Sequence, residues 1–469
     1  MKIKHTDIII NEDNPFANCK LDRLQYAKIL TNIISSYSDG FVLAINNEWG
    51  TGKTTFVKMW QQYLNNESYK TIYFNAWEND FDLNPIVAIM SELKALSNSS
   101  NKELYKSVLQ KGAVLSKKIL PALLKSLSKK YLFDSDIIID AIENTAEAAT
   151  EILEEEIKEY TDKKQTVREF REELEKFVEK VDNNKPILFI IDELDRCRPN
   201  YAVELLEQMK HFFSVKGIVF VLSIDKTQLS HAIKGVYGSD RINSDEYLRR
   251  FIDLEYSIPF PSIEKFCKYL YDYYSFDDIF KERRKHSEFA SDDDSLLRIS
   301  TMLFTKDNAT LRQQEKIYGF TRLVLSSFKH NYYIFPDLFF VLIYMKVTKP
   351  ELYIKIRNQT IALQDLSNGF TGLFPTNLYG VFDVNLLYIE AELLHFYNNQ
   401  RDYYQREKLI EADENRNNFT SIKSRLDMGT GQTSLIECLV HVSSSLNCRD
   451  IKLSYLLNKI DLLESININ

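Results

Sequence analysis

The feature that most constrains this chain is a glycine-containing segment between an apolar run and a helical pattern. Residues 41–46 read FVLAIN, residues 47–55 read NEWGTGKTT, and FVKMWQQYL follows with apolar residues at helical spacing. A strand, a glycine loop and a helix start in this order are the context that a phosphate loop requires. The segment 47–55 therefore predicts a loop that holds the phosphates of a nucleotide.

Each part of this loop has an expected role. Gly50 and Gly52 let backbone N–H groups turn toward the β-phosphate, Lys53 reaches the β and γ oxygens, and Thr54 ligates Mg²⁺. The usual pattern has a glycine where Asn47 stands, and because Asn tolerates positive φ better than most residues, we expect an intact loop. The predicted nucleotide contacts are Asn47, Glu48, Trp49, Gly50, Thr51, Gly52, Lys53, Thr54 and Thr55.

Further apolar runs indicate the fold class. They lie at 71–77, 187–192, 218–225 and 251–256, with helical patterns between most of them. Strands that are apolar on both faces are typical of a parallel sheet covered by helices, so the sequence predicts an α/β P-loop NTPase core. We expect this core at 1–96 and 185–260, a helical insertion at 97–184 that stands off the core, and a C-terminal helical domain at 261–469.

The run ILFIIDELDRCRP brings two carboxylates to the end of one of these strands. Asp192 is expected to hold the Mg²⁺ through water, and Glu193 to polarise the water that attacks the γ-phosphate. The alternative is a solvated strand end that caps a helix. Asp195 and Arg196 follow, either as an ion pair that supports the loop or in a catalytic role. Asp225 closes the next strand and is a candidate for the polar residue between the acidic pair and the γ-phosphate.

An arginine at the transition state has several candidates: Arg196, Arg249, Arg250 and Arg312. The sequence does not choose among them, and Arg250 and Arg312 stand in the predicted catalytic set. The NKxD element that reads guanine in GTPases is absent because Ser223 stands before Ile-Asp-Lys in place of Asn. The cofactors expected are therefore ATP and Mg²⁺.

Composition excludes some classes of protein. A net charge of −8 and an isoelectric point near 5.6 argue against a chain that coats nucleic acid by charge alone, although a local basic channel stays open. Five cysteines with no CxxC pair indicate reduced thiols and give no support to zinc. The N-terminus has no long apolar run, and the longest uncharged apolar stretch, 338–345, is too short for a membrane span. We therefore expect a cytoplasmic protein.

The insertion carries an unusual basic stretch. Residues 106–133 hold seven lysines and no acidic residue, and Pro121 should kink the helix that they form. Contact with a membrane surface is one interpretation. The other is pairing with residues 151–181, where acidic side chains are mixed with apolar residues at three- and four-residue steps.

Five segments, taken together, resemble the KAP family of P-loop NTPases. They read EWGTGKTTF, YFNAWEND, FIIDELDRCRP, KGIVFVLSIDKTQLSHAIKGVYG and YLRRFIDLEYSIPFP, and they cover roughly residues 15–270. The run LRQQEKIYGFTRLVLSS is similar to the helix after the core in that family, with Arg312 as the matching arginine. Asn47 departs from the family's pattern, and Glu193 stands where many members have Asp.

The resemblance implies an ASCE-type core with a segment inserted between the second and third strands. Members sometimes carry transmembrane helices in that insertion, where this chain offers only its basic stretch. Bacterial members are often associated with phage exclusion or other antiviral defence, beside partner gene products. We therefore expect a Mg²⁺-dependent ATPase that acts as a nucleotide-driven switch, as a homo-oligomer and/or with a partner effector. A membrane-surface signalling scaffold and a nucleic-acid-stimulated motor or loader are the alternatives.

Overall fold

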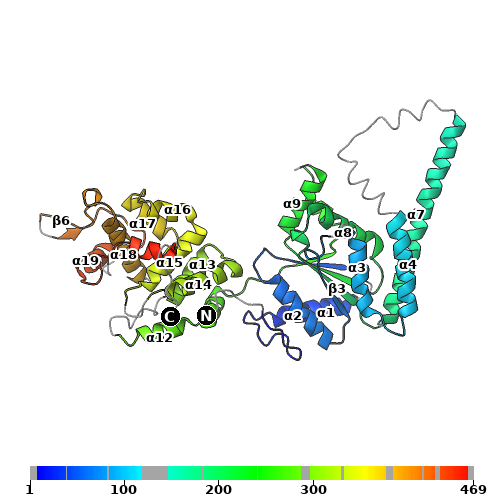
Figure 1. Ribbon diagram of the computed structural model, residues 1–469, viewed down its shortest axis with the longest axis horizontal. Coiled ribbons are helices and arrows are strands. Elements are labelled where there is room, and N and C mark those ends of the chain that lie inside the picture. The colour runs from blue at the N-terminus through cyan, green and yellow to red at the C-terminus, as the bar shows by residue number, and fades with distance from the viewer. Residues whose placement is uncertain are drawn as a thin grey trace. The chain divides into compact units, whose positions relative to one another are not determined.

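The chain folds into two compact units, Asp7–Phe260 and Pro261–Asn469. The computed structural model describes residues 8–37, 40–81, 84–118, 146–181, 184–239, 241–286, 296–328, 332–375, 384–414, 417–427 and 434–462. Figure 1 shows a sheet with helices in the first unit and a mostly helical second unit. Each unit is described by itself below.

A five-stranded parallel sheet forms the centre of the first unit. Its strands stand in the order β2-β3-β4-β1-β5, and every neighbouring pair runs parallel. Every residue of β3 and β4 is buried, as expected for strands that are covered on both faces. The bounds are Val42–Asn46 for β1, Thr71–Asn75 for β2, Ile187–Asp192 for β3, Ile218–Ile224 for β4 and Leu254–Tyr256 for β5. The predicted α/β core is confirmed.

Helices cover both faces of this sheet (Figure 1). Alternate strand residues enter two separate cores, because successive side chains of a strand point to opposite faces. Leu188 and Ile190 of β3 pack with α1 (Leu24–Ser36) and α2 (Lys53–Asn66). Phe189 and Ile191 pack on the other side. The helices of that side are α3 (Pro85–Leu93), α8 (Pro199–Phe212) and α9 (Lys226–Tyr237), with the short η1 (Lys94–Leu96), η2 (Leu194–Arg196) and α10 (Ser244–Leu248) between elements.

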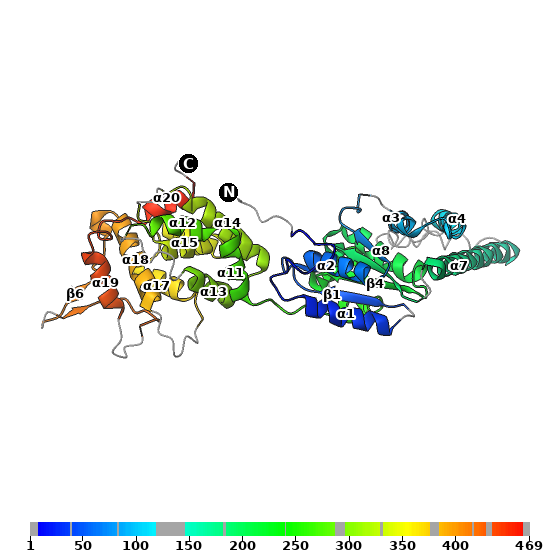
Figure 2. The ribbon, with the colours of Figure 1, turned by 90° about the horizontal axis from the view of Figure 1, so that it is seen from below.

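The insertion contains two long helices, α4 (Lys102–Lys118) and α7 (Ala146–Val181), which lie side by side in both views (Figures 1 and 2). The expectation that the insertion stands off the core is wrong for the second half of α7. Phe170, Leu174 and Phe177 are fully buried in the same core as the sheet residues. Apolar side chains at three- and four-residue steps gave α7 a face that is buried against α4 and the core. Only the earlier part of α7 extends beyond its partner, where Ile157 is 56% exposed.

The basic stretch is described only as far as residue 118, so the predicted kink at Pro121 lies outside the described residues. Within the described part, Lys111 forms an ion pair of 2.6 Å with Glu169 of α7. This contact favours pairing with the acidic helix over contact with a membrane. Among the described residues, no helix is both long enough and apolar enough to cross a membrane.

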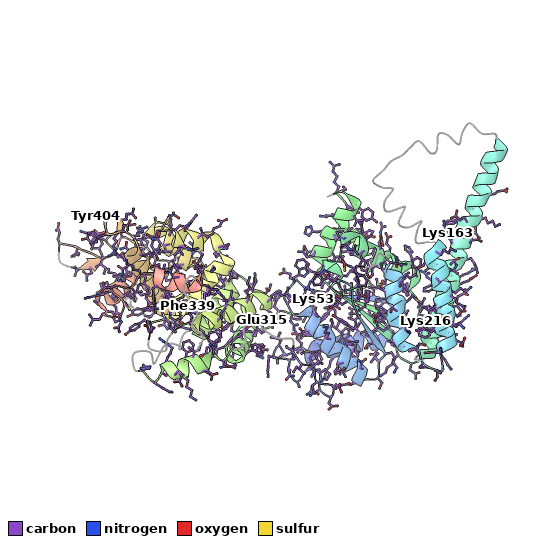
Figure 3. All side chains as sticks on the ribbon, in the orientation of Figure 1. Lys53, Lys163, Lys216, Glu315, Phe339 and Tyr404 are labelled. Atoms are coloured by element: carbon purple, nitrogen blue, oxygen red, sulfur yellow. The ribbon has the colours of Figure 1, made fainter. Side chains whose placement is uncertain are left out.

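The second unit is built from helices around α15 (Pro336–Thr348). All residues from Leu338 to Met345 are buried, including Phe339 (Figure 3), so the longest apolar stretch of the chain is the centre of a helical core. The surrounding helices are α11 (Ile263–Tyr273), α12 (Phe276–Arg283), α13 (Leu296–Lys306), α14 (Leu311–Leu325), α16 (Pro350–Arg357), α17 (Leu363–Thr371), α18 (Val384–Gln400), α19 (Leu435–Ser444) and α20 (Ser454–Ile460). A short helix η4 (Tyr403–Gln405) and a hairpin of β6 (Glu411–Ala412) and β7 (Asn418–Phe419) complete it.

Candidate functional site

The predicted phosphate loop connects β1 to α2 at the carboxyl edge of the sheet. Gly50 and Gly52 have φ values of 78° and 80°, a backbone region that favours glycine. Gly52 is the N-cap of α2, so Lys53, Thr54 and Thr55 stand in its first turn. The Thr51 hydroxyl donates to the Glu48 carbonyl at 2.8 Å and closes the turn from within. The glycines therefore stand where the loop needs them.

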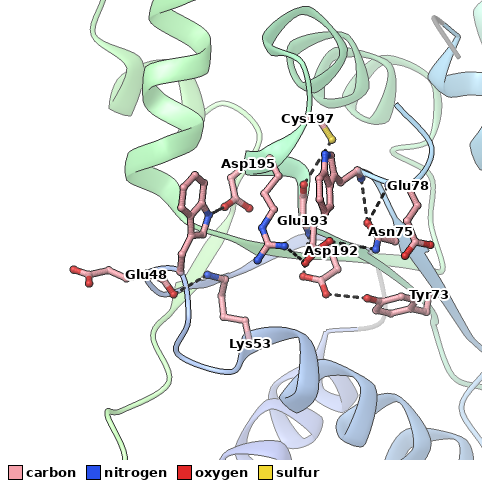
Figure 4. A network of polar contacts seen from close by, with 12 residues as sticks. Glu48, Lys53, Tyr73, Asn75, Glu78, Asp192, Glu193, Asp195 and Cys197 are labelled. Carbon is pink, nitrogen blue, oxygen red and sulfur yellow. Dashed lines mark hydrogen bonds and ion pairs between the residues drawn. The ribbon is translucent and has the colours of Figure 1, made fainter. Parts of the chain in front are cut away.

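Lys53 points back over this loop (Figure 4). Its ammonium donates to the carbonyls of Asn47 and Glu48, the latter at 3.1 Å. Burial lowers the pKa of Lys53, and the carboxylates of Asp195, Asp225 and Asp192 oppose that shift. The ammonium thus lies within the field of the acidic residues that follow β3 and β4.

Asn47 is accommodated for a different reason than the sequence suggested. It is not among the non-glycine residues with positive φ. Its side chain instead makes two hydrogen bonds with the backbone of Ile258, donating to the carbonyl at 2.8 Å and accepting from the N–H at 2.9 Å. A glycine would lose both bonds. Asn47, at the start of the loop, therefore ties the loop to the segment that follows β5.

Asp192 ends β3 and is 1% exposed. Its carboxylate accepts from the Tyr73 hydroxyl at 2.9 Å and from the Glu193 N–H at 3.0 Å. Burial and this carboxylate both raise the pKa of Tyr73, so the hydroxyl keeps its proton and stays a donor. Oxygen ligands suit Mg²⁺, which is usually held by one or two carboxylates together with substrate phosphates. Asp192 fits that type of site, and Thr54, in the first turn of α2, stays the predicted second ligand.

Glu193 has a left-handed backbone, with φ of 61°, which is uncommon for a residue other than glycine. One carboxylate oxygen pairs with Arg196 at 2.5 Å, and the other accepts from the Asn75 amide at 3.3 Å (Figure 4). Burial raises the pKa of Glu193, while Arg196 lowers it. The turn directs this carboxylate away from the line of β3 and into a polar network with groups from β2 and η2.

Asp195 and Arg196 do not pair with each other. Asp195 accepts from the indole N–H of Trp49, which is a residue of the phosphate loop. Burial raises the pKa of Asp195, while the Trp49 bond and Lys53 lower it. The Arg196 guanidinium lies over the Trp77 ring at 5.7 Å while it binds Glu193. Both residues therefore support the site from the loop after β3.

Asp225 directly follows β4, the strand between β3 and β1. The N–H of Asn47 donates to the carbonyl of Ile224, which fixes this strand end beside the phosphate loop. The Asp225 carboxylate also caps α9, accepting from the N–H groups of Thr227 at 3.1 Å and Gln228 at 3.2 Å. A capping role is thus established, and a catalytic one stays a prediction.

Of the candidate arginines in the first unit, Arg196 lies at this site and Arg250 does not. Arg250 lies before β5, near the opposite edge of the sheet, because Asp253 pairs with Val42 at the start of β1. Its side chain is exposed, and its carbonyl accepts from Lys210. Arg312 is an exposed residue of α14 in the second unit. The roles of both stay predictions.

Sequence reasoning missed four residues of the site. One is Arg23, whose guanidinium donates to the carbonyls of Gly52 at 2.8 Å and Thr51 at 2.6 Å. The others are Tyr73, Asn75 and, as the partner of Asp195, the side chain of Trp49. Tyr73 and Asn75 belong to β2, and the sequence indicated them only as part of an apolar run and of the segment YFNAWEND. Their position beside β3 could have been found from the strand order, since Asn75 is the register partner of Asp192. Arg23 gave no signal in the sequence.

Comparison with protein families matches residues 23–325 to the KAP family P-loop domain, well over half of the chain. No curated protein matches the chain. A solved structure, the ORC2 protein of Aeropyrum pernix in ADPNP–ADP complexes, is 12% identical and covers 94% of this chain and 93% of its own, with a TM-score of 0.32 that is too low to support an argument. The loop geometry, the acidic strand end and the family match agree, and the chain belongs to the KAP family of P-loop NTPases.

Proposed function

We propose that this chain is a Mg²⁺-dependent ATPase whose nucleotide cycle acts as a switch. The observation that supports it most is the meeting of Lys53, Asp192 and Glu193 at the carboxyl edge of one parallel sheet. The absence of the guanine-reading NKxD element favours ATP over GTP. The match to the KAP family supports the nucleotide class of the ligand.

The residues of the chain divide the work of hydrolysis. The Lys53 ammonium exchanges the carbonyls of Asn47 and Glu48 for β- and γ-phosphate oxygens when ATP binds. Asp192 and Thr54 would hold Mg²⁺, which neutralises charge on those oxygens. Glu193 accepts a hydrogen bond from the attacking water and orients it in line with the γ-phosphate. Its partners Asn75 and Arg196 decide where that carboxylate points.

The biological role we propose is antiviral defence in a bacterial cytoplasm, together with a partner effector. The support is the resemblance to family members associated with phage exclusion, together with a large helical unit that can carry a nucleotide signal. Oligomerisation is part of the proposal, because the exposed Arg250 lies near the edge of the sheet opposite the phosphate loop of its own subunit. In this proposal, Arg250 would act at the transition state in a neighbouring subunit, because it lies away from the phosphate loop of its own.

The first test is ATP hydrolysis by the purified protein with and without Mg²⁺. Lys53→Ala should lose ATP binding, and Glu193→Gln should bind ATP with turnover reduced about 10²- to 10⁴-fold, because the water loses its acceptor. Solution mass is followed in the same samples to detect nucleotide-dependent assembly.

Two exposed residues of α7, Glu179 and Lys180, provide matched controls, and Glu179→Gln and Lys180→Ala should hydrolyse ATP like the wild type. The proposal would be contradicted if the wild-type protein neither binds nor hydrolyses ATP. Hydrolysis that appears only with DNA or RNA would favour the motor or loader, and sedimentation with anionic vesicles would favour the membrane scaffold.

A further inference from the structure

Arg23 lies directly before α1 and is 5% exposed, yet its guanidinium binds no acidic group among the described residues. Its two terminal nitrogens donate to consecutive carbonyls of the phosphate loop, Nη1 to Gly52 at 2.8 Å and Nη2 to Thr51 at 2.6 Å. The remaining nitrogen, Nε, is buried without a partner in the described part of the chain. Removing a cation from water costs free energy, and the contacts that offset this cost here are hydrogen bonds to two peptide carbonyls.

The direction of these two carbonyls fixes the direction of two N–H groups. No peptide bond of the described chain is cis, and in a planar trans peptide the carbonyl and the N–H point to opposite sides. Because the Thr51 and Gly52 carbonyls point toward Arg23, the N–H groups of Gly52 and Lys53 point away from it. Neither N–H has a hydrogen-bond partner in the described structure, and α2 leaves such N–H groups free at its first turn.

We propose that Arg23 is a positioning residue for phosphate binding: its guanidinium holds two peptide planes so that the N–H groups of Gly52 and Lys53 face the β-phosphate. This inference rests on the proposed nucleotide function. In this proposal Arg23 acts through the loop carbonyls that it binds and makes no direct contact with the nucleotide. The planar fork of an arginine matches two adjacent carbonyls, whereas a lysine offers a single point of attachment.

The segment before Arg23 keeps the side chain in place. Phe16 packs against Phe56 and Tyr63 of α2, with ring centroids 6.3 Å apart in both pairs. The carbonyl of Glu12 accepts from Asn66 at 2.7 Å near the far end of the same helix. The N-terminal segment thus lies along α2, and Arg23 is fixed to the helix whose first turn it positions.

The test is a comparison of Arg23→Lys and Arg23→Met with the wild type, by equilibrium binding of ADP and ATP and by steady-state hydrolysis. Arg23→Lys keeps the charge and most of the volume, so it retains the fold if Arg23→Met does not. It should weaken ADP and ATP by the same factor, about tenfold or more, because both contain the β-phosphate and one charge-assisted bond is lost. KM for ATP should rise by a similar factor, with kcat changed much less.

The control is Arg401→Lys in the second unit, where a guanidinium also donates to a backbone carbonyl, that of Ile361 at 2.8 Å. It should change thermal stability without changing either affinity. If folded Arg23→Lys protein binds ADP and ATP with normal affinity, the inference about Arg23 is overturned and the proposed function is not affected. A wild-type protein that binds neither nucleotide would overturn the proposed function and this inference with it.

Discussion

At single side chains, the site is an arrangement in which each acidic group has its own partner. Tyr73 serves Asp192, Asn75 and Arg196 serve Glu193, and Trp49 serves Asp195. Without such partners, carboxylates so close together would repel one another and their pKa values would rise. The surrounding donors are therefore what keeps a cluster of charges compatible with a buried strand end.

Removing Arg196 should shift the pH dependence of hydrolysis. Burial raises the pKa of Glu193 and Arg196 lowers it, so Arg196→Ala should raise that pKa further. Because the carboxylate is the form that orients water, activity falls as pH drops through this pKa, and the acidic limb of the rate profile should move to higher pH. The measurement is kcat against pH for wild type and Arg196→Ala.

Arg168→Ala is the control for this change, because Arg168 is an exposed residue of α7 whose ionic partner, at 4.0 Å, is Glu172 of the same helix. Its profile should superimpose on that of the wild type. If the acidic limb of Arg196→Ala lies at the same pH as that of the wild type, then the protonation of Glu193 does not govern the rate, or the ion pair between Arg196 and Glu193 is broken when ATP binds.

The site shows what a single sequence can and cannot reveal. The glycines, Lys53 and the two acidic residues could be predicted because their chemistry is tied to short local spacing. Arg23 and Tyr73 could not, since each meets its partner only after folding, 29 and 119 residues away along the chain. Asn47 was expected to matter for its backbone, whereas its amide group is what the structure uses.

Among helices and strands, apolar patterning predicted which elements form but not their neighbours. The runs at 187–192 and 218–225 are buried on both faces and became β3 and β4. The run at 251–256 gave only the short β5, and Phe251 is buried in the core outside that strand. Strand order depends on crossover connections and cannot be read from hydrophobic periodicity.

The insertion provides a direct test of how far the core extends. Phe170 is fully buried against the sheet-side core, so Phe170→Ala should lower the free energy of unfolding by about 3–5 kcal/mol. Ile157→Ala, on the same helix at a position 56% exposed, should change it by less than about 0.5 kcal/mol. Urea unfolding monitored by circular dichroism measures both. Equal effects of the two substitutions would contradict the packing of α7 described above.

For the protein as a whole, the second unit contains a buried acid that should make its stability depend on pH. Glu390 of α18 is 0% exposed and accepts from the hydroxyls of Ser367 and Ser424, each at 2.6 Å. Burial raises its pKa to about 7, with Asp427 adding to the shift and the two serines opposing it. The folded unit therefore holds a proton that the unfolded chain releases at lower pH.

The sign of this effect follows from linkage. Because the folded pKa lies above the unfolded value, the burial of charge costs stability above pH 7, and this cost disappears as pH falls toward the unfolded pKa. Glu390→Gln should therefore raise the melting temperature relative to wild type at pH 8 and bring little or no gain at pH 5. Thermal unfolding at both values tests this, with Glu351→Gln at an exposed position as the control. A difference between variants that does not change with pH would contradict the titration of Glu390.

The amide pair between Asn47 and Ile258 has a consequence for the connection of the two units. Ile258 precedes Pro261, the first residue of the second unit, by three positions. Two reciprocal hydrogen bonds couple these residues. Any movement of the phosphate loop that displaces Asn47 must either break both bonds or move Ile258 as well. The first residue of the phosphate loop is therefore hydrogen-bonded to the segment that connects the two units.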